Sequence, residues 1–102
     1  MKKNDHEEAI DLFKALSDPM RLQILVLISD KEICACKILD YLSISQPTLS
    51  HHMKILMSCK LVVGRKEATW MHYTINKKMV KKLHQIIDLC IKDKSNSRRA
   101  LV

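Results

Sequence analysis

Apolar residues recur at helical spacing over most of the chain, and each recurrence predicts a helix. Three such segments are residues 7–16, residues 19–29 and residues 77–91. Asp18 is placed to cap the second of them, and Pro19 suits its first turn because its missing N–H would have no partner there. The second helix is apolar on nearly all sides, which predicts that it lies at the centre of the core.

Two further helices are expected between these segments. The third begins near residues 30–32 and ends at about Leu42, and the fourth runs to about Ser58 after a short break. Ser45 is the expected N-cap of the fourth helix, with Pro47 in its first turn. One face of this helix is apolar and the other is polar or basic, so one side should pack on the core while the other faces outward.

The pattern changes period after the fourth helix. Residues 61–63 and 69–75 are rich in β-branched and aromatic side chains, and the charged residues 65–68 between them predict a hairpin tip. The expected fold is mainly α with a small β-hairpin (α+β), in the order α-α-α-α-β-β-α, which is typical of a winged helix-turn-helix. We expect one domain over residues 1–92 and a basic, polar, disordered tail over residues 93–102.

Basic residues are concentrated in the second half of the chain. Residues 1–40 carry eight acidic and six basic side chains, whereas residues 41–87 carry eight basic side chains opposed only by Glu67. A localised positive field is the expected footprint of phosphate binding, and it favours a nucleic-acid partner over a merely solvated basic face. A binder that ignores base sequence is the alternative, and it would have an affinity set by salt alone.

Composition excludes several other classes of protein. The first residues are charged and lack the apolar segment of a signal peptide, and the longest apolar run, near residues 24–28, is too short to span a bilayer. We therefore expect a cytoplasmic protein with no membrane partner. Its four cysteines are more typical of packing, metal binding or redox sensing than of disulfides. A thiol enzyme would need a C-x-x-C motif that the chain lacks, so no enzyme activity is expected.

Four segments resemble the ArsR/SmtB family of bacterial metal-sensing repressors, in particular its arsenical-resistance branch. They are residues 16–22 (LSDPMRL), 32–36 (EICAC), 45–54 (SQPTLSHHMK) and the pair Arg65-Lys66. The likeness covers about residues 7–91, with the motifs in matching order and spacing. It implies a homodimer whose fourth helix enters the major groove of operator DNA until an inducing ion binds. The apolar stripes on the first and last helices favour a homodimer formed through those two helices.

The fourth helix and the hairpin tip carry the expected DNA contacts. Hydroxyl, amide and imidazole groups can reach base edges and phosphates, and lysine or arginine can neutralise phosphate. The predicted DNA-binding residues are Ser45, Gln46, Thr48, Ser50, His51, Lys54, Arg65 and Lys66. The adjacent His52 should instead face the supporting layer. The expected partner is double-stranded operator DNA, and binding it should require no cofactor.

Cys34 and Cys36 stand where, by the resemblance, the arsenic sensors of the family carry their thiolates. Residues two apart on an α-helix are separated by about 200° around its axis, so both sulfurs can grip one ion only if the third helix distorts at its start. We therefore expect ion binding and DNA binding to oppose each other. Soft thiolates suit As(III) or Sb(III) as inducer, and also Cd(II) or Pb(II).

The inducer and its third ligand stay open at this point. Leu39 stands where some arsenic sensors have another cysteine, so a third ligand could be Cys59, Cys90 or a small thiol. Cys90 is otherwise expected to be a buried small hydrophobe. Lys37 follows the pair and could lower the pKa of Cys36. Cadmium and lead sensors add earlier cysteines that this chain lacks. The remaining alternative is a redox or persulfide sensor of the same fold, in which the first thiol of the pair forms a disulfide.

Overall fold

Capping residues set where the helices begin. The computed structural model describes residues 3–91, so the predicted disordered tail at residues 93–102 lies outside the described residues. The Asp18 carboxylate accepts hydrogen bonds from the backbone N–H groups of Met20 and Arg21, at 2.8 and 3.1 Å. Pro19 follows in the first turn. These contacts confirm the predicted start of the second helix, because they satisfy N–H groups that have no partner inside it.

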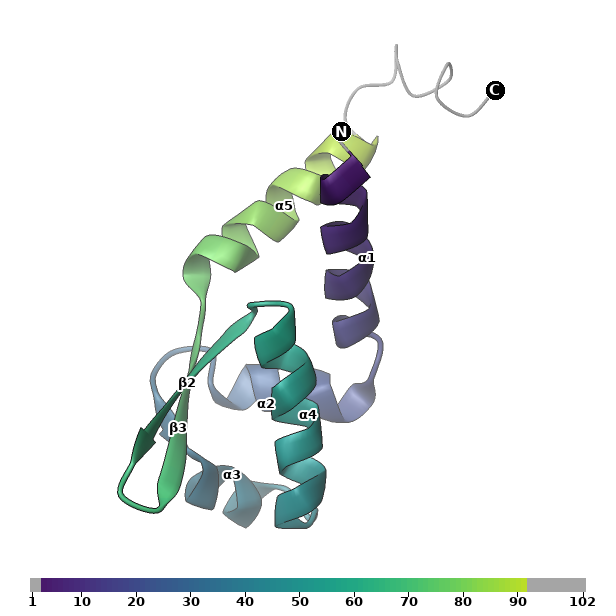
Figure 1. Cartoon of the computed structure of the whole chain (residues 1–102). Coiled ribbons are helices and arrows are strands. Elements are labelled where there is room, and N and C mark those ends of the chain that lie inside the picture. The colour runs from purple at the N-terminus through teal and green to yellow at the C-terminus, as the bar shows by residue number, and fades with distance from the viewer. Residues whose placement is uncertain (1–2, 92–102) are drawn as a thin grey trace.

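Five helices and three strands follow one another along residues 3–91 (Figure 1). They are α1 (Lys3–Leu16), α2 (Pro19–Leu27), β1 (Ile33–Cys34), α3 (Ala35–Tyr41), α4 (Gln46–Ser58), β2 (Val62–Glu67), β3 (Trp70–Ile75) and α5 (Lys77–Ile91). The mainly α fold with a wing is as predicted, but the order contains one more strand than expected. The third helix was predicted to begin near residues 30–32, which is wrong: β1 occupies the residues just before it. The first helix begins earlier than expected, at Lys3.

The three strands form one antiparallel sheet in the order β1-β3-β2. β1 pairs with β3 through Cys34 opposite His72, and β2 pairs with the same strand through Arg65 opposite His72. The predicted hairpin tip at residues 65–68 is displaced, because Arg65 and Lys66 belong to the body of β2. The chain turns at Ala68, whose positive φ of 56° is typical of the first residue of a tight hairpin turn.

The core is formed where one face of α1, α4 and α5 meets α2 and the sheet. Leu12, Ile24, Met53 and Leu56 are completely buried. The other core side chains are Ala9, Ala15, Ile28, Ala35, Ile38, Leu49, Leu61, Val62, Tyr73, Met79, Leu83 and Ile86. The apolar face predicted for the fourth helix is therefore confirmed.

Two predictions of burial are wrong in the single chain. On α2, Leu22 and Val26 are 48% and 72% exposed, because α1 and α4 pack on only one side of this helix. Near the end of α5, Cys90 is exposed, although a buried position was expected. Ile87 beside it is 39% exposed. An apolar surface thus remains uncovered on both helices.

The elements are arranged in two parts along the molecule. α1 and α5 lie side by side at one end, where Lys82 Nζ and Glu8 Oε2 are 2.7 Å apart. α3 and the hairpin lie at the other end, and α4 runs between the two ends with its first turn beside α3 (Figure 1). The residues predicted to contact DNA therefore lie along α4, at its N-cap and on the hairpin, outside the arm formed by α1 and α5.

Candidate functional site

The exposed face of α4 presents most of the predicted DNA-binding residues. Leu49, Met53 and Leu56 anchor the opposite face in the core, so the rest of the helix surface points outward. The exposed polar residues in the first three turns of α4 are Gln46, Thr48, Ser50, His51 and Lys54. Donors, acceptors and a cation are thus spread over the outward surface of α4, and these are the groups that contact base edges and phosphates.

Ser45 acts first as the N-cap of α4. Its hydroxyl accepts a hydrogen bond from the Thr48 backbone N–H at 3.3 Å and lies 2.9 Å from the Thr48 hydroxyl, to which it can donate. Both side chains are exposed. The contact fixes the start of the helix and holds the two hydroxyls side by side at its outer end.

Arg21 ties α4 to the end of α1. Its Nε donates to the carbonyl oxygen of Ala15 at 2.6 Å, in the last turn of α1, and its Nη2 donates to that of Lys14 at 3.3 Å, which also accepts from the Ser17 N–H. Its Nη1 lies 3.2 Å from Nδ1 of His52 on α4. Because arginine only donates, His52 accepts at Nδ1. The predicted position of His52 in the supporting layer is confirmed, because it is half-buried, whereas His51 is exposed.

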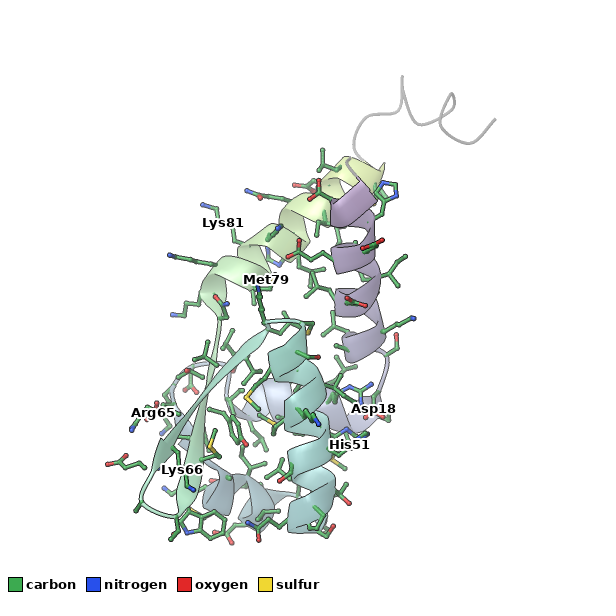
Figure 2. All side chains as sticks on the ribbon, viewed as in Figure 1. Asp18, His51, Arg65, Lys66, Met79 and Lys81 are labelled. Carbon is green, nitrogen blue, oxygen red and sulfur yellow. The ribbon has the colours of Figure 1, made fainter. Side chains whose placement is uncertain are left out.

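The wing is the hairpin formed by β2 and β3. Its two basic residues, Arg65 and Lys66, lie on opposite faces of this hairpin. Lys66 pairs with Met71, on the same face as Gly64 and Tyr73, and this face packs toward Met57 of α4. Arg65 pairs with His72 on the other face and points away from α4 (Figure 2). Alternation along a strand makes this separation unavoidable for adjacent residues.

Arg65 is held by two carboxylates. Its Nε and Nη2 lie 2.8 and 2.6 Å from the two oxygens of Glu32, and its Nη1 lies 3.0 Å from Glu67. The hydrogen bond to Glu32 is the main reason that the pKa of Arg65 is raised, and the same bond lowers the pKa of Glu32. His72 lies 3.9 Å from Glu32 and 3.7 Å from Glu67, between the two. Bidentate pairing of this kind fixes orientation as well as charge.

Cys34 and Cys36 come together at the start of α3, in a geometry different from the one predicted. Cys34 ends β1 with extended backbone, and its Sγ accepts a hydrogen bond from the Cys36 backbone N–H at 3.3 Å, so it is the N-cap of α3. The predicted separation of two cysteines on one regular helix is therefore wrong. Because Cys34 precedes the helix, both half-buried thiols lie around its first turn.

The pKa of the Cys36 thiol is raised. A hydrogen bond with the Cys34 side chain is the largest cause, followed by burial. Lys37 does lower this pKa, but through its backbone hydrogen bond rather than the expected side-chain charge, and the neighbouring thiol and burial outweigh that effect. The pair therefore favours the protonated thiol at Cys36.

Neither of the other two cysteines joins the pair within the chain. Cys59 is the C-cap of α4, lies near Asp11 and Lys60 in a surface hollow, and has a pKa raised by burial. Cys90 is exposed near the end of α5. Between residues 3 and 91, no three histidine, cysteine or acidic side chains are gathered closely enough to hold a metal ion. Two thiols are thus the donor set that one copy brings together.

Glu32, His72 and Arg21 were not identified as site residues from the sequence. Glu32 and His72 meet only because β1 pairs with β3, and a two-residue strand has no periodicity to reveal it. Arg21 lies in the motif at residues 16–22, but its contacts with α1 and α4 depend on tertiary packing.

In the described part of the chain, no helix is long and apolar enough to cross a membrane.

Comparisons with known proteins agree with this geometry. Residues 18–63 match the family described as "Bacterial regulatory protein, arsR family". The chain is 44% identical over 84 residues to an uncharacterised HTH-type transcriptional regulator of Methanocaldococcus jannaschii, covering 81% of this chain and 94% of that protein. It is 43% identical over 84 residues to an arsenical resistance operon repressor of Staphylococcus xylosus, covering 82% of this chain and 81% of the repressor.

A solved structure is similar in fold as well. The homodimeric winged helix-turn-helix DNA-binding domain of a Mycobacterium bovis protein has a TM-score of 0.68 and 27% identity, covering 88% of this chain and 83% of that domain. These findings confirm the resemblance inferred from the four motifs, and they describe DNA-binding regulators rather than enzymes. The chain therefore belongs to the arsR family of bacterial regulatory proteins and is a winged helix-turn-helix transcriptional repressor.

Proposed function

We propose that this repressor binds operator DNA as a homodimer and releases it when arsenite or antimonite binds Cys34 and Cys36. The observation that carries the proposal is that Cys34 Sγ has two roles. Cys34 Sγ caps α3 through the Cys36 N–H, and the same sulfur is one of two adjacent soft donors. A bond from this sulfur to an ion competes with the cap, so the start of α3 must rearrange when the pair closes.

Arsenite can bind both thiols without any change of oxidation state. Each thiol displaces one hydroxyl group of As(OH)₃: an As–S bond replaces an As–O bond, and the thiol proton leaves with the hydroxyl as water. Two such exchanges give a ring that contains both sulfurs and retains one As–OH. A third thiol, from a second copy or a small molecule, would replace the last hydroxyl.

Operator binding is assigned to α4 and the wing. We propose that Gln46, Thr48, Ser50 and His51 contact base edges or phosphates, and that Lys54 and Lys66 neutralise phosphates. All of these side chains are exposed, and Lys66 lies on the face of the hairpin that packs toward α4. Ser45 contributes through its cap at the outer end of the helix. The role of Arg65 is treated separately below, because two carboxylates already hold it.

The homodimer is proposed to form through α1 and α5. Exposed apolar side chains remain on both helices, among them Phe13 on α1 and Ile87 and Leu89 on α5. Beside them, α2 and α5 border an apolar groove of about 740 Å³. A second copy would bury this surface and place two copies of α4 for the two halves of an operator.

The test is a gel shift with DNA from upstream of the gene, with and without arsenite. Wild type should bind about 10- to 100-fold more weakly with arsenite, which is a normal size for coupling between two sites. Cys34→Ser should bind the operator as wild type does, since serine also caps a helix, but arsenite should no longer release it. Cys36→Ser should likewise resist release.

Matched arms separate the alternatives. Cys90→Ser removes an exposed thiol remote from α3 and should behave as wild type. If both Cys34→Ser and Cys36→Ser are released like wild type, the pair is not the sensor. If peroxide or polysulfide releases wild type and arsenite does not, the protein is a redox or persulfide sensor. Release by Cd²⁺ or Pb²⁺ alone would assign the inducer to those ions instead.

A further inference from the structure

We infer that Glu32 and Arg65 are positioning residues that join the cysteine pair to the wing, so that the wing responds when the pair closes on an ion. This inference rests on the proposed function above and gives the route by which the cysteines reach the DNA-binding surface. It also assigns Arg65, predicted from the sequence as a DNA contact, to a different task.

The connection is a row of side chains across the outer face of the sheet. The register places Cys34 of β1, His72 of β3 and Arg65 of β2 opposite one another, and paired residues share a face. Glu32 lies two residues before Cys34, and alternation places it on the same face. Its carboxylate contacts the outermost member of the row, Arg65, and lies 3.9 Å from His72.

The Glu32–Arg65 ion pair links the residue just before β1 to β2, and β1 and β2 are the two outer strands of the sheet. β1 comprises only two residues, so its backbone pairing with β3 is short. The bidentate contact from Glu32 to Arg65 spans β3 and fixes this short strand to β2. A displacement of Cys34 therefore reaches the wing directly, through a carboxylate two residues away.

Two observations favour a positioning role for Arg65 over phosphate binding. The side chain points away from α4 (Figure 2), whereas the neighbouring Lys66 lies on the α4 side. In addition, Glu32 and Glu67 both compensate its charge. A phosphate would have to displace one of these carboxylates to gain a bidentate contact.

The test compares Glu32→Gln with Glu67→Gln. Both variants remove one negative charge beside Arg65, so they change the overall field on DNA equally. Only Glu32→Gln breaks the tie between β1 and the wing, because Glu67 belongs to β2 itself. The quantity measured is the operator Kd with arsenite divided by the operator Kd without it.

Glu32→Gln should reduce this ratio about tenfold relative to wild type, which is within the usual range of coupling between sites, while arsenite still binds the thiols. Glu67→Gln should leave the ratio within about twofold. The double variant Glu32→Gln/Arg65→Gln should match Glu32→Gln alone, because both changes break one link. A purely structural pair would weaken operator binding in both states and leave the ratio unchanged, which would overturn the inference.

A second readout does not depend on operator release. Trp70 is the single tryptophan, is half-buried, and lies on β3 opposite Glu67. Its fluorescence should change when arsenite binds wild type or Glu67→Gln, and the change should be lost in Glu32→Gln. Equal fluorescence changes in all three proteins would contradict the inference while leaving the cysteine pair as the sensor.

A third arm keeps the inference testable if arsenite is not the inducer. In a Cys36→Ser/Cys59→Ser/Cys90→Ser background, Cys34 is the only thiol, and its alkylation rate by iodoacetamide is measured with and without operator DNA. Cys34 is half-buried, and a shift of its position when the operator binds should change its access to iodoacetamide. The alkylation rate should therefore change severalfold with operator DNA, and adding Glu32→Gln should abolish the change. Failure of arsenite to bind wild type would refute the proposed inducer alone. An alkylation rate that operator DNA does not alter would refute the connection.

Discussion

Single side chains cap the N-termini of α2, α3 and α4. Asp18, Ser45 and Cys34 cap α2, α4 and α3 in turn, each by accepting a backbone N–H. The three caps differ in chemistry: the carboxylate is charged, the hydroxyl is neutral, and the thiol can be taken by an ion. The cap of α2 is therefore sensitive to acid, and under the proposed function the cap of α3 is sensitive to soft ions.

The Asp18 cap makes stability depend on pH. The backbone hydrogen bond from Arg21 is the main reason that the pKa of Asp18 lies below its ordinary value of 3.8. A lowered folded pKa means that the contribution is complete above 3.8 and is lost as pH falls through the folded value. Urea unfolding of wild type should therefore lose stability below pH 3.8. Asp18→Asn, which keeps a capping side chain without the titration, should lose less.

The control for this prediction is Asp30→Asn, which neutralises an exposed carboxyl group in the turn after α2. Its unfolding midpoint should follow the wild-type pH dependence. If Asp18→Asn followed it equally well, the cap would not be the acid-sensitive group.

At the scale of elements, the wing depends on the smallest residue at its centre. A Cβ at Gly64 would lie 2.9 Å from Met57 Sδ, 2.9 Å from Met71 Cε and 3.1 Å from Tyr73 Cε1. The two methionine tips are flexible, whereas the Tyr73 ring is buried in the core. Close packing of β2 on α4 thus requires glycine or a neighbour that can move.

Gly64→Ala should lower the free energy of unfolding by about 1 kcal/mol, and Gly64→Val by about 3 kcal/mol, because valine adds two further methyl groups to a site that is already crowded. Val63→Ala, at an exposed position of the same strand, should change it by no more than about 0.5 kcal/mol. The measurement is urea unfolding at one fixed protein concentration, since any dimer contributes to stability. Equal costs for the two Gly64 variants would show that the packing is looser than described.

Helices were predictable from the sequence to the extent that periodicity and caps specify them. Asp18 and Ser45 were identified because a capping side chain beside an apolar run is a local signal. β1 was missed because two residues carry no period, and its existence depends on β3, which lies more than thirty residues later. The prediction that Cys34 lies within a regular helix was wrong for the same reason, because β1 ends at this residue. The partners of Arg65 followed from sheet order, which the local pattern does not encode.

At the scale of the whole molecule, the exposed apolar surface of α1 and α5 predicts an assembly. Ile87→Glu should place a charge in the proposed interface and convert the dimer to a monomer in sedimentation experiments, because burying an unpaired carboxylate is costly. Phe13→Glu should act in the same way from α1. Tyr41→Glu changes a side chain on α3 that is 70% exposed, and it should leave the dimer intact.

A dimer that survives both Ile87→Glu and Phe13→Glu would place the interface elsewhere. The apolar groove between α2 and α5 offers the alternative position, and Val26→Glu would test it, since Val26 lines that groove and is 72% exposed. Operator affinity should fall together with dimer content in whichever variant dissociates, because two copies of α4 are needed to occupy both half-sites.

The contacts of Arg21 bear on the spacing between the two α4 helices of the proposed dimer. Its guanidinium holds the last carbonyls of α1 and the ring of His52 on α4 in one cluster. In a dimer joined through α1 and α5, this cluster fixes the angle between the joined arm and each reading helix. That angle determines how far apart the two α4 helices stand, and hence how many base pairs separate the half-sites that one protein can bridge. In the proposed dimer, Arg21 would therefore influence which half-site spacing is bound without contacting DNA itself.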